Sequence, residues 1–362
     1  MRQEKRLLST LACLITILVI IAPMVLLRTA QAAGDKELVV HTWGGRVLES
    51  QQHAFFEPFK RETGIKIVPV TAAGELWGKV AAQVKSGNIE WDIVWPDNIG
   101  QVGAAAQKGL IQELDFDIIT DTKDLVPGAV TKYGVGLEIV DFIYGYNHKV
   151  FPGDKHPKSW ADFYDPKKFP GLRGTHNWGT PVLHFISALL ADGVPPDELV
   201  PIDWDRAFKV LDRVKSDLIF YNSGDKAMQL MIDEEAVMCF TTDARTKTSI
   251  LLGAPVSPQW NQGIAYINYH CVVKGAPHRE AAMRFINFTC RPEQQAIWTN
   301  YMSATCVNPR SLEYIHPTFM KDQVTYPENW EKRVDLYTEK TVEWFTEHND
   351  EINERFNEWV SK

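Results

Sequence analysis

The chain has 362 residues, of which 45% are hydrophobic, 23% charged and 11% aromatic, with 12 tryptophans among them. This composition excludes a disordered chain, a collagen-like repeat and a small disulfide scaffold, and the length predicts one large or two medium domains. A net charge of −8 would repel phosphate backbones and anionic lipid surfaces, so we expect no nucleic-acid partner.

The N-terminus has the pattern of an export signal. Arg2, Lys5 and Arg6 precede an apolar run over 7–27, and Ala30-Gln31-Ala32 follows as a cleavage site. We therefore expect residues 1–32 to be a signal peptide, which predicts a periplasmic protein with no stable membrane insertion after cleavage. The run exceeds the usual length of about 7–15 residues, so an uncleaved anchor is the competing interpretation.

The chain then alternates strands and amphipathic helices, predicted at 38–43, 49–62, 65–70, 75–85 and 91–95. This order is typical of an α/β protein with an open, mostly parallel sheet and helices on both faces. Ligands of such sheets bind beyond the carboxyl ends of the strands. Trp43 and Gly44 after the first strand, and Asp97 and Asn98 after the third, are therefore predicted at one edge of a site.

Two apolar segments, 133–147 and 264–273, are predicted to cross between two lobes. The remaining predicted elements are helices near 103–109, 159–163, 181–192, 204–214, 225–231 and 277–288, strands at 171–178 and 235–240, and acidic helices from 330 onward. Two crossings predict a first lobe of 33–140 plus 265–324, a second lobe of 141–264, and C-terminal helices over 325–362. A ligand cleft is expected between the lobes.

Metal-binding and catalytic signatures are absent from the sequence. Four cysteines follow the predicted signal, Cys239, Cys271, Cys290 and Cys306, and their spacing fits no metal site. We interpret them as small buried hydrophobic residues and leave their pairing open. The sequence also lacks the nucleophile-elbow, zinc-protease, P-loop and dinucleotide motifs, so we expect no cofactor, no metal and no catalytic residue.

Four segments carry more specific patterns: Trp43 after a first strand, Phe-Lys-Arg-Glu-Thr-Gly-Ile-Lys-Ile at 59–67, Trp-Asp-Ile-Val at 91–94, and Lys-Gly-Ala-Pro-His at 274–278 ahead of Phe-Ile-Asn-Phe at 285–288. In this order they resemble the periplasmic solute-binding proteins of ABC importers of the spermidine/putrescine type. The resemblance runs from Leu38 to about Asn308. It implies the two-lobed periplasmic-binding-protein fold (type II) and a receptor that delivers a small solute to ABC permease subunits. We expect a monomer.

The resemblance also implies positions for ligand contacts. It places Trp43 and Gly44 at the cleft floor, Asp97 at a small polar position, and Asp243 as an amine partner. Tyr266 and Asn268 fall on an aromatic residue and an aspartate that relatives use to stack on a polyamine and to pair with it. The acidic residues that relatives carry near 171–178 are replaced here by Thr175, His176, Asn177 and Trp178.

The candidate residues are suited to two kinds of solute. Asp97 and Asp243 would compensate ammonium groups, and Trp43, Trp178, Trp260 and Tyr266 would add cation–π attraction. Arg245 and His176 offer hydrogen-bond donors to a carboxylate or a phosphonate. The main prediction is an amine-bearing, polyamine-like solute, and the alternative is a zwitterion or small anion such as an amino acid derivative, an opine or an aminophosphonate.

Three other functions stay open. An exported hydrolase would turn over its ligand. An iron-binding receptor would need adjacent tyrosines, which Tyr266, Tyr269 and Tyr301 do not provide. A ligand-dependent partner of a membrane sensor would share the same fold.

Overall fold

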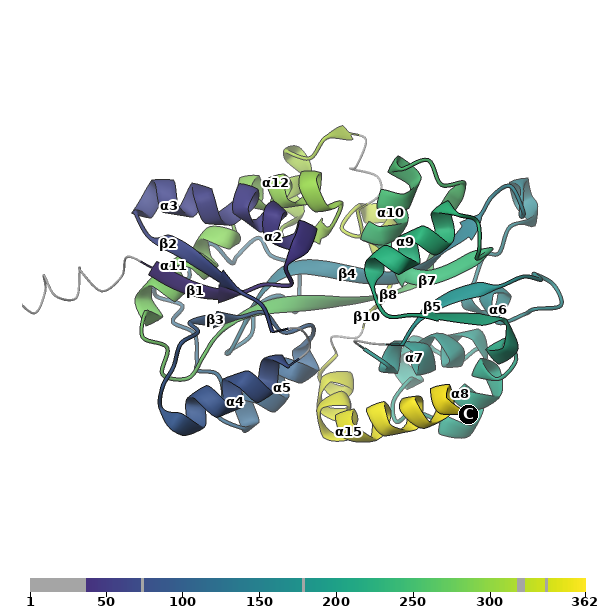
Figure 1. The fold of residues 1–362 in the computed structure, drawn as a ribbon, viewed down its shortest axis with the longest axis horizontal. Helices are drawn as coiled ribbons and strands as arrows, with labels where there is room; N and C mark the ends of the chain where they lie inside the picture. The colour runs from purple at the N-terminus through teal and green to yellow at the C-terminus, as the bar shows by residue number, and fades with distance from the viewer. Residues whose placement is uncertain (1–36, 73–74, 178–179, 318–322, 336–337) are drawn as a thin grey trace, which may run out of the picture.

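The computed structural model describes residues 37–72, 75–177, 180–317, 323–335 and 338–362. The predicted signal peptide and Trp178 lie outside the described residues. Within them, the strands form one ten-stranded sheet in the order β2-β1-β3-β8-β4-β7-β5-β6, with β9 on β4 and β10 on β8. Helices cover both faces of this sheet (Figure 1). The predicted α/β class is therefore confirmed.

The first part of the sheet is parallel. β1 (Glu37–His41) lies between β2 (Lys66–Val70) and β3 (Ile93–Val94) and pairs with both in parallel. Leu38, Val40 and Ile93 are fully buried because helices cover both faces of these strands. The connecting helices are α2 (Gly45–Gln51), the π-helical turn η1 (Gln52–Phe56), α3 (Glu57–Thr63) and α4 (Leu76–Ser86), and α5 (Ile99–Gln107) follows β3.

Two long antiparallel strands carry the sheet from one half of the molecule to the other. They are β4 (Val135–Asn147) and β8 (Val256–Val272), which pair along most of their lengths. β8 also pairs with β3 at one end, and β4 pairs with β7 (Met238–Thr242) at the other. β8 begins eight residues before the predicted crossing segment at 264–273, because its polar first half is held by main-chain pairing with β4 rather than by apolar packing.

The second part of the sheet continues with β5 (Arg173–His176), parallel to both β7 and β6 (Leu218–Tyr221). Its helices are α6 (Trp160–Phe163), α7 (Val182–Ala191), α8 (Trp204–Leu211), α9 (Gly224–Ile232) and α10 (Asp243–Leu251). The chain then returns through α11 (Arg279–Thr289), α12 (Pro292–Met302), β9 (Thr305–Cys306), α14 (Pro327–Trp330), β10 (Val334–Asp335) and α15 (Glu339–Ser361). Short 3-10 turns are η2 (Gly153–Lys155), η3 (Pro196–Glu198), η4 (Lys215–Asp217) and η5 (Pro309–Glu313).

The buried apolar side chains form two main clusters. The first cluster contains residues from 38–139 and 265–324, and the second contains residues from 142–266 and from α15. We call the elements packed on the first cluster the first lobe, and those packed on the second cluster the second lobe. The cluster changes between Ile139 and Phe142 on β4, which supports the boundaries predicted from sequence; those boundaries stay a prediction.

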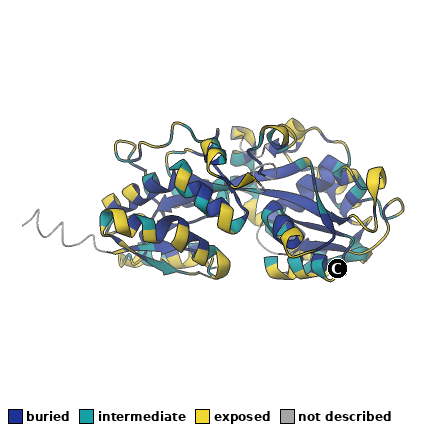
Figure 2. Ribbon diagram, turned by 90° about the horizontal axis from the view of Figure 1, so that it is seen from above, coloured by how far each residue is buried: buried dark blue, intermediate teal, exposed yellow. Residues whose placement is uncertain are grey.

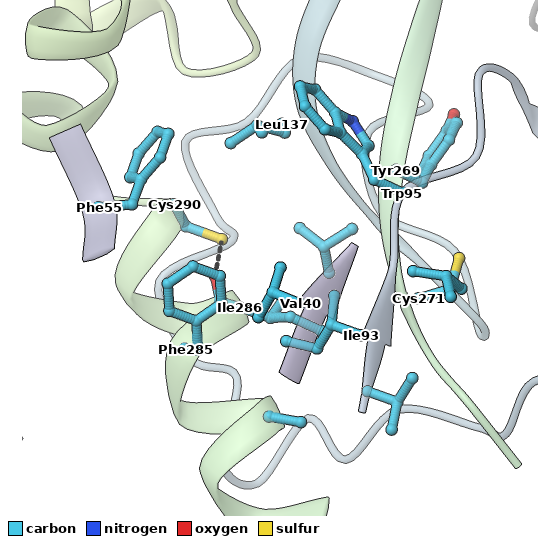
Figure 3. Packing of buried hydrophobic residues seen from close by; sticks show 14 of the residues in the cluster. Val40, Phe55, Ile93, Trp95, Leu137, Tyr269, Cys271, Phe285, Ile286 and Cys290 are labelled. Atoms are coloured by element: carbon cyan, nitrogen blue, oxygen red, sulfur yellow. Dashed lines mark hydrogen bonds between the residues drawn. The ribbon is translucent and has the colours of Figure 1, made fainter. Parts of the chain in front are cut away.

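The strands are buried and the outer helix faces are exposed in both lobes (Figure 2). Figure 3 shows the first cluster, where Phe285 and Ile286 of α11 pack near Val40 and Ile93 of the sheet. Cys290 donates a hydrogen bond to the Ile286 carbonyl at 3.3 Å. Together with Cys239, Cys271 and Cys306 it is buried and free, which agrees with our interpretation as small core residues.

Over the described ranges, every helix is too short or too polar to cross a membrane. Within the same ranges, histidine, cysteine, aspartate and glutamate form no group of three that could hold a metal ion.

Candidate functional site

A cavity of about 210 Å³ lies where the two lobes meet. Its wall comes from the loops after β1 and β3, the middle of β4 and β8, and the N-terminal ends of α9 and α10. Seven of the residues predicted from the sequence line it: Trp43, Asp97, His176, Asp243, Arg245, Tyr266 and Asn268. Segments that are about 200 residues apart in sequence thus contribute to one site.

Trp43 reaches the cavity through a turn that only glycine adopts readily. Gly44 has φ 75° and ψ −171°, a conformation that is strongly disfavoured for residues with a Cβ, and Gly45 also has positive φ. The turn leads from β1 into α2 and leaves Trp43 41% exposed, with its ring edge against His41. Gly44 shapes this turn and is not itself part of the cavity wall.

Two carboxyl groups of the first lobe face the cavity. Gln101 of α5 donates a hydrogen bond to Asp97 Oδ2 at 3.0 Å, and burial raises the pKa of Asp97 to about 6. Trp298 Nε1 donates to Glu138 Oε2 at 2.9 Å. Burial raises the pKa of Glu138 to about 8 in spite of this hydrogen bond. Burial therefore favours the neutral form of this carboxyl group.

Glu138 was not among the predicted site residues. It interrupts an apolar crossing strand, and an acid in such a strand is a signal that could have identified it. Asn268 of β8 lies across from it in register. Asn268 Oδ1 is buried and lacks a hydrogen-bond partner within the described part of the chain. This oxygen is a further acceptor in the cavity wall.

Arg245 brings a positive charge to the second-lobe side of the cavity. It lies in the first turn of α10, which Thr242 caps by accepting the Arg245 N–H at 3.3 Å. Its guanidinium lies against Gly224, the first residue of α9, where any Cβ would collide with it. Arg245 Nη1 is 3.3 Å from Asp225 Oδ1, but the Asp225 side chain is 85% exposed. Such an exposed pair contributes little, so Arg245 keeps donors for a bound group.

Asp243 lines the cavity but already has a cationic partner. Lys247, one turn further along α10, donates a hydrogen bond to Asp243 Oδ2 at 2.9 Å. Both side chains are almost completely buried, at 2% for Asp243 and 4% for Lys247. The residue predicted as an amine partner is therefore paired within the chain.

Aromatic rings form another part of the wall. Tyr266 stacks on Phe142 at a centroid distance of 5.8 Å, and His176 tilts against the same ring at 5.1 Å. Phe142 is another cavity residue that the sequence did not single out. Its apolar strand context is indistinguishable from that of ordinary core residues, so no sequence signal separates it from the core.

The structure does not bring every predicted residue to this cavity. Trp260 packs against the first core cluster and is not part of the cavity wall. Asn98 caps α5 by accepting the Gln101 N–H at 3.1 Å, and it lines a neighbouring cavity between α5, α7 and α15. Trp178 lies outside the described residues. The predicted aromatic box is therefore reduced to Trp43 and Tyr266 among the described residues.

Comparisons with known proteins identify the family of this chain. Residues 54–328 match the family of bacterial extracellular solute-binding proteins. The chain is 28% identical to the gamma-aminobutyric acid-binding protein of Pseudomonas aeruginosa over 340 residues, covering 92% of this chain and 93% of that protein. It is 23% identical to the spermidine/putrescine-binding periplasmic protein of Escherichia coli over 324 residues, covering 87% and 88%.

A solved structure of a gamma-aminobutyric acid (GABA) receptor is 34% identical, with a TM-score of 0.82 over 90% of this chain and 98% of that one. A cavity between two lobes, with a few polar groups in a mostly apolar wall, is an arrangement suited to binding a small molecule. The chain belongs to the bacterial extracellular solute-binding proteins. A solved ABC transporter substrate-binding protein from Bradyrhizobium japonicum is 31% identical to it, with a TM-score of 0.81 over 90% of this chain and 99% of that one.

Proposed function

We propose that this receptor captures a small zwitterion, with an amino group at one end and a carboxylate at the other, and delivers it to its membrane permease. The observation that carries the proposal is that Arg245 lines the same cavity as Asp97 and Glu138. The gamma-aminobutyric acid-binding relatives support it, because that compound has this distribution of charge.

The ammonium end fits the first-lobe side of the cavity. Burial makes the charged forms of Asp97 and Glu138 unfavourable, and a cation bound beside them offsets this effect. The Asn268 oxygen adds a neutral acceptor. Trp43 and Tyr266 offer ring faces to the methylene groups or to the ammonium itself.

The carboxylate end fits the second-lobe side. The Arg245 guanidinium can donate two hydrogen bonds to a carboxylate, and Thr242, Asp243 and Ala244 at the start of α10 line the same region. The unpaired N–H groups and the dipole of a helix N-terminus favour an anion. A solute bound at both ends would bridge the lobes and stabilise their approach, which is the whole mechanism of such a receptor.

A polyamine is the second candidate, because two carboxyl groups, Asp97 and Glu138, line the first-lobe side. The spermidine/putrescine-binding relatives support this reading. It leaves the Arg245 charge without a solute partner, which makes the zwitterion the better fit. A periplasmic location also belongs to the proposal, and the family of extracellular solute-binding proteins supports it. Removal of residues 1–32, a monomeric state and the absence of enzymatic turnover complete the proposal.

The charge of Arg245 is tested by Arg245→Met. We expect the affinity for GABA to fall by at least tenfold, or about 1.4 kcal/mol, because a desolvated carboxylate loses its charge-assisted partner. Isothermal titration calorimetry of the variant and of Arg213→Met measures this. Arg213 pairs with Asp192 on the surface of the second lobe and serves as the matched control. Equal affinity of the two variants would contradict the proposed orientation.

A further inference from the structure

We propose that Lys247 determines specificity by acting as a built-in ammonium: it occupies Asp243 and so restricts the cavity to solutes that carry a single amino group. The inference rests on the proposed function and assigns to that site a discrimination between monoamines and diamines. It concerns a residue that lies behind the cavity wall.

Lys247 pairs with Asp243 from outside the cavity wall. Asp243 is part of the cavity wall and Lys247 is not, although both belong to the first two turns of α10. Their atoms Nζ and Oδ2 are 2.9 Å apart, and Thr305 Oγ1 of β9 lies 3.5 Å from the same carboxylate oxygen. The ion pair is therefore enclosed on the side away from the cavity.

The positions of the acidic residues around the cavity explain why the Asp243–Lys247 pair would determine specificity. Among the described residues that line it, the carboxyl groups are Asp97, Glu138 and Asp243. The first two belong to the first-lobe side. A diamine that reaches toward the second lobe would need an anion beside Arg245, and Asp243 is the carboxylate there. Because Lys247 already neutralises Asp243, the second ammonium would be desolvated next to Arg245 without compensation.

A tethered ammonium also has an advantage over a free one. Lys247 is held one helical turn from Asp243, so its pairing costs no translational freedom, whereas a solute ammonium must pay for its immobilisation. A dissolved diamine therefore cannot displace it at ordinary concentrations.

A second buried acid lies near the same lysine. Asp141 of β4 is buried, and its Oδ1 has no hydrogen-bond partner within the described residues. Burial raises its pKa far above the usual range, the charge of Asp243 raises it further, and the charges of Lys247 and Arg333 lower it. Asp141 thus favours its neutral form, and removing the lysine charge would leave the Asp243 carboxylate without its ion-pair partner in this buried region.

The test is Lys247→Gln, titrated by calorimetry with putrescine and with GABA. We expect the ratio of putrescine to GABA affinity to rise by at least tenfold over the native protein, because the freed carboxylate attracts an ammonium and repels a carboxylate. An unchanged ratio would overturn the inference. If native protein binds putrescine as tightly as the variant does, Lys247 excludes nothing and the inference is wrong.

The double variant Asp243→Asn with Lys247→Gln is the matched control. Its two neutral amides can hydrogen-bond to each other, so it should show no gain for putrescine. A gain equal to that of the single variant would show that the Asp243 charge is not responsible, and would overturn the inference.

An unpaired buried carboxylate strongly destabilises a protein. If the single variant does not fold alone, its refolding yield with either ligand becomes the readout, and rescue by putrescine but not by GABA is expected. Rescue by neither would contradict the inference. The proposed function is tested by a different result: it is wrong if the native protein does not bind GABA, whatever the variants do.

Discussion

The proposed site predicts that Glu138 and Asp97 link solute binding to proton release. Burial raises the pKa of Glu138 to about 8 and that of Asp97 to about 6, so each carboxyl group keeps its proton up to a higher pH than usual, and an arriving ammonium disfavours that protonated form. A bound cation lowers both pKa values, and the bound state then carries fewer protons than the empty one. Affinity for an amine should therefore rise with pH between about 6 and 8, following proton linkage.

Calorimetry in two buffers of different ionisation enthalpy measures this release. We expect GABA to bind several-fold more tightly at pH 8 than at pH 6, with protons released at pH 7. In Glu138→Gln the dependence should flatten between pH 7 and 8, while the part due to Asp97 persists at lower pH. A native affinity that is constant over this range would show that neither carboxyl group contacts the amine.

The Arg245 guanidinium lies against Gly224, so Gly224→Ala is a second test at a single residue. A Cβ at this position would collide with the guanidinium. We expect affinity for GABA to fall by about tenfold through displacement of Arg245, while the empty protein keeps its melting temperature because alanine suits the first turn of a helix. A loss of stability with unchanged affinity would make Gly224 a purely structural residue.

Sequence patterns located some of these residues for clear physical reasons. Trp43 and Asp97 follow strands of a parallel sheet, and the carboxyl ends of such strands meet at one edge. Lys247 stands four residues after Asp243, a spacing that pairs charges on one face of a helix, yet this pairing was not anticipated. Gly224 has no sequence signal, because its role depends on a side chain from another helix.

At the scale of elements, α5 of the first lobe contacts α15 of the second. A Cβ on Gly103 of α5 would lie 3.2 Å from Thr346 Oγ1 of α15, so the two helices approach closely there. Phe356 of α15 belongs to the second core cluster, whereas Val102 of α5 belongs to the first. The two helices therefore join the lobes on the side away from α10 (Figure 1).

A larger side chain at this contact should oppose the approach of the lobes. Gly103→Leu is expected to lower affinity for GABA by several-fold, because the leucine side chain would push α15 away from α5. Gly78→Leu in the exposed face of α4, where a Cβ would meet nothing within 4 Å, is the control. Equal effects of the two variants on affinity would exclude a role for this contact in binding.

Most elements follow from local patterns, and the exceptions have physical causes. The β-α-β-α-β order of the first lobe, the crossing strand β4 and helices α7 and α9 are confirmed near their predicted positions. β6 was missed because its four residues form a strand only by pairing with β5. α12 was missed because apolar and polar residues alternate around it without a single apolar face.

At the scale of the molecule, the sequence led to the fold class and the family but not to the charge of the solute. Hydrophobic periodicity and two crossings determine a two-lobed α/β protein, and the family match confirms the receptor class. The charge of the solute that the cavity accepts depends on which carboxylates have no cationic partner in the folded protein. The pairing of Asp243 with Lys247 and the burial of Glu138 arise only from that tertiary arrangement.

The charge pattern of the whole cavity is tested most directly by three four-carbon compounds with different ends: GABA, putrescine and succinate. Their affinities for the native chain from Ala33 onward, measured by calorimetry under one set of conditions, compare amine with carboxylate at nearly constant length. We expect GABA to bind at least ten times more tightly than either other compound, because it alone matches Arg245 at one end and Asp97 with Glu138 at the other. Tighter binding of putrescine or of succinate would contradict the proposed zwitterion site.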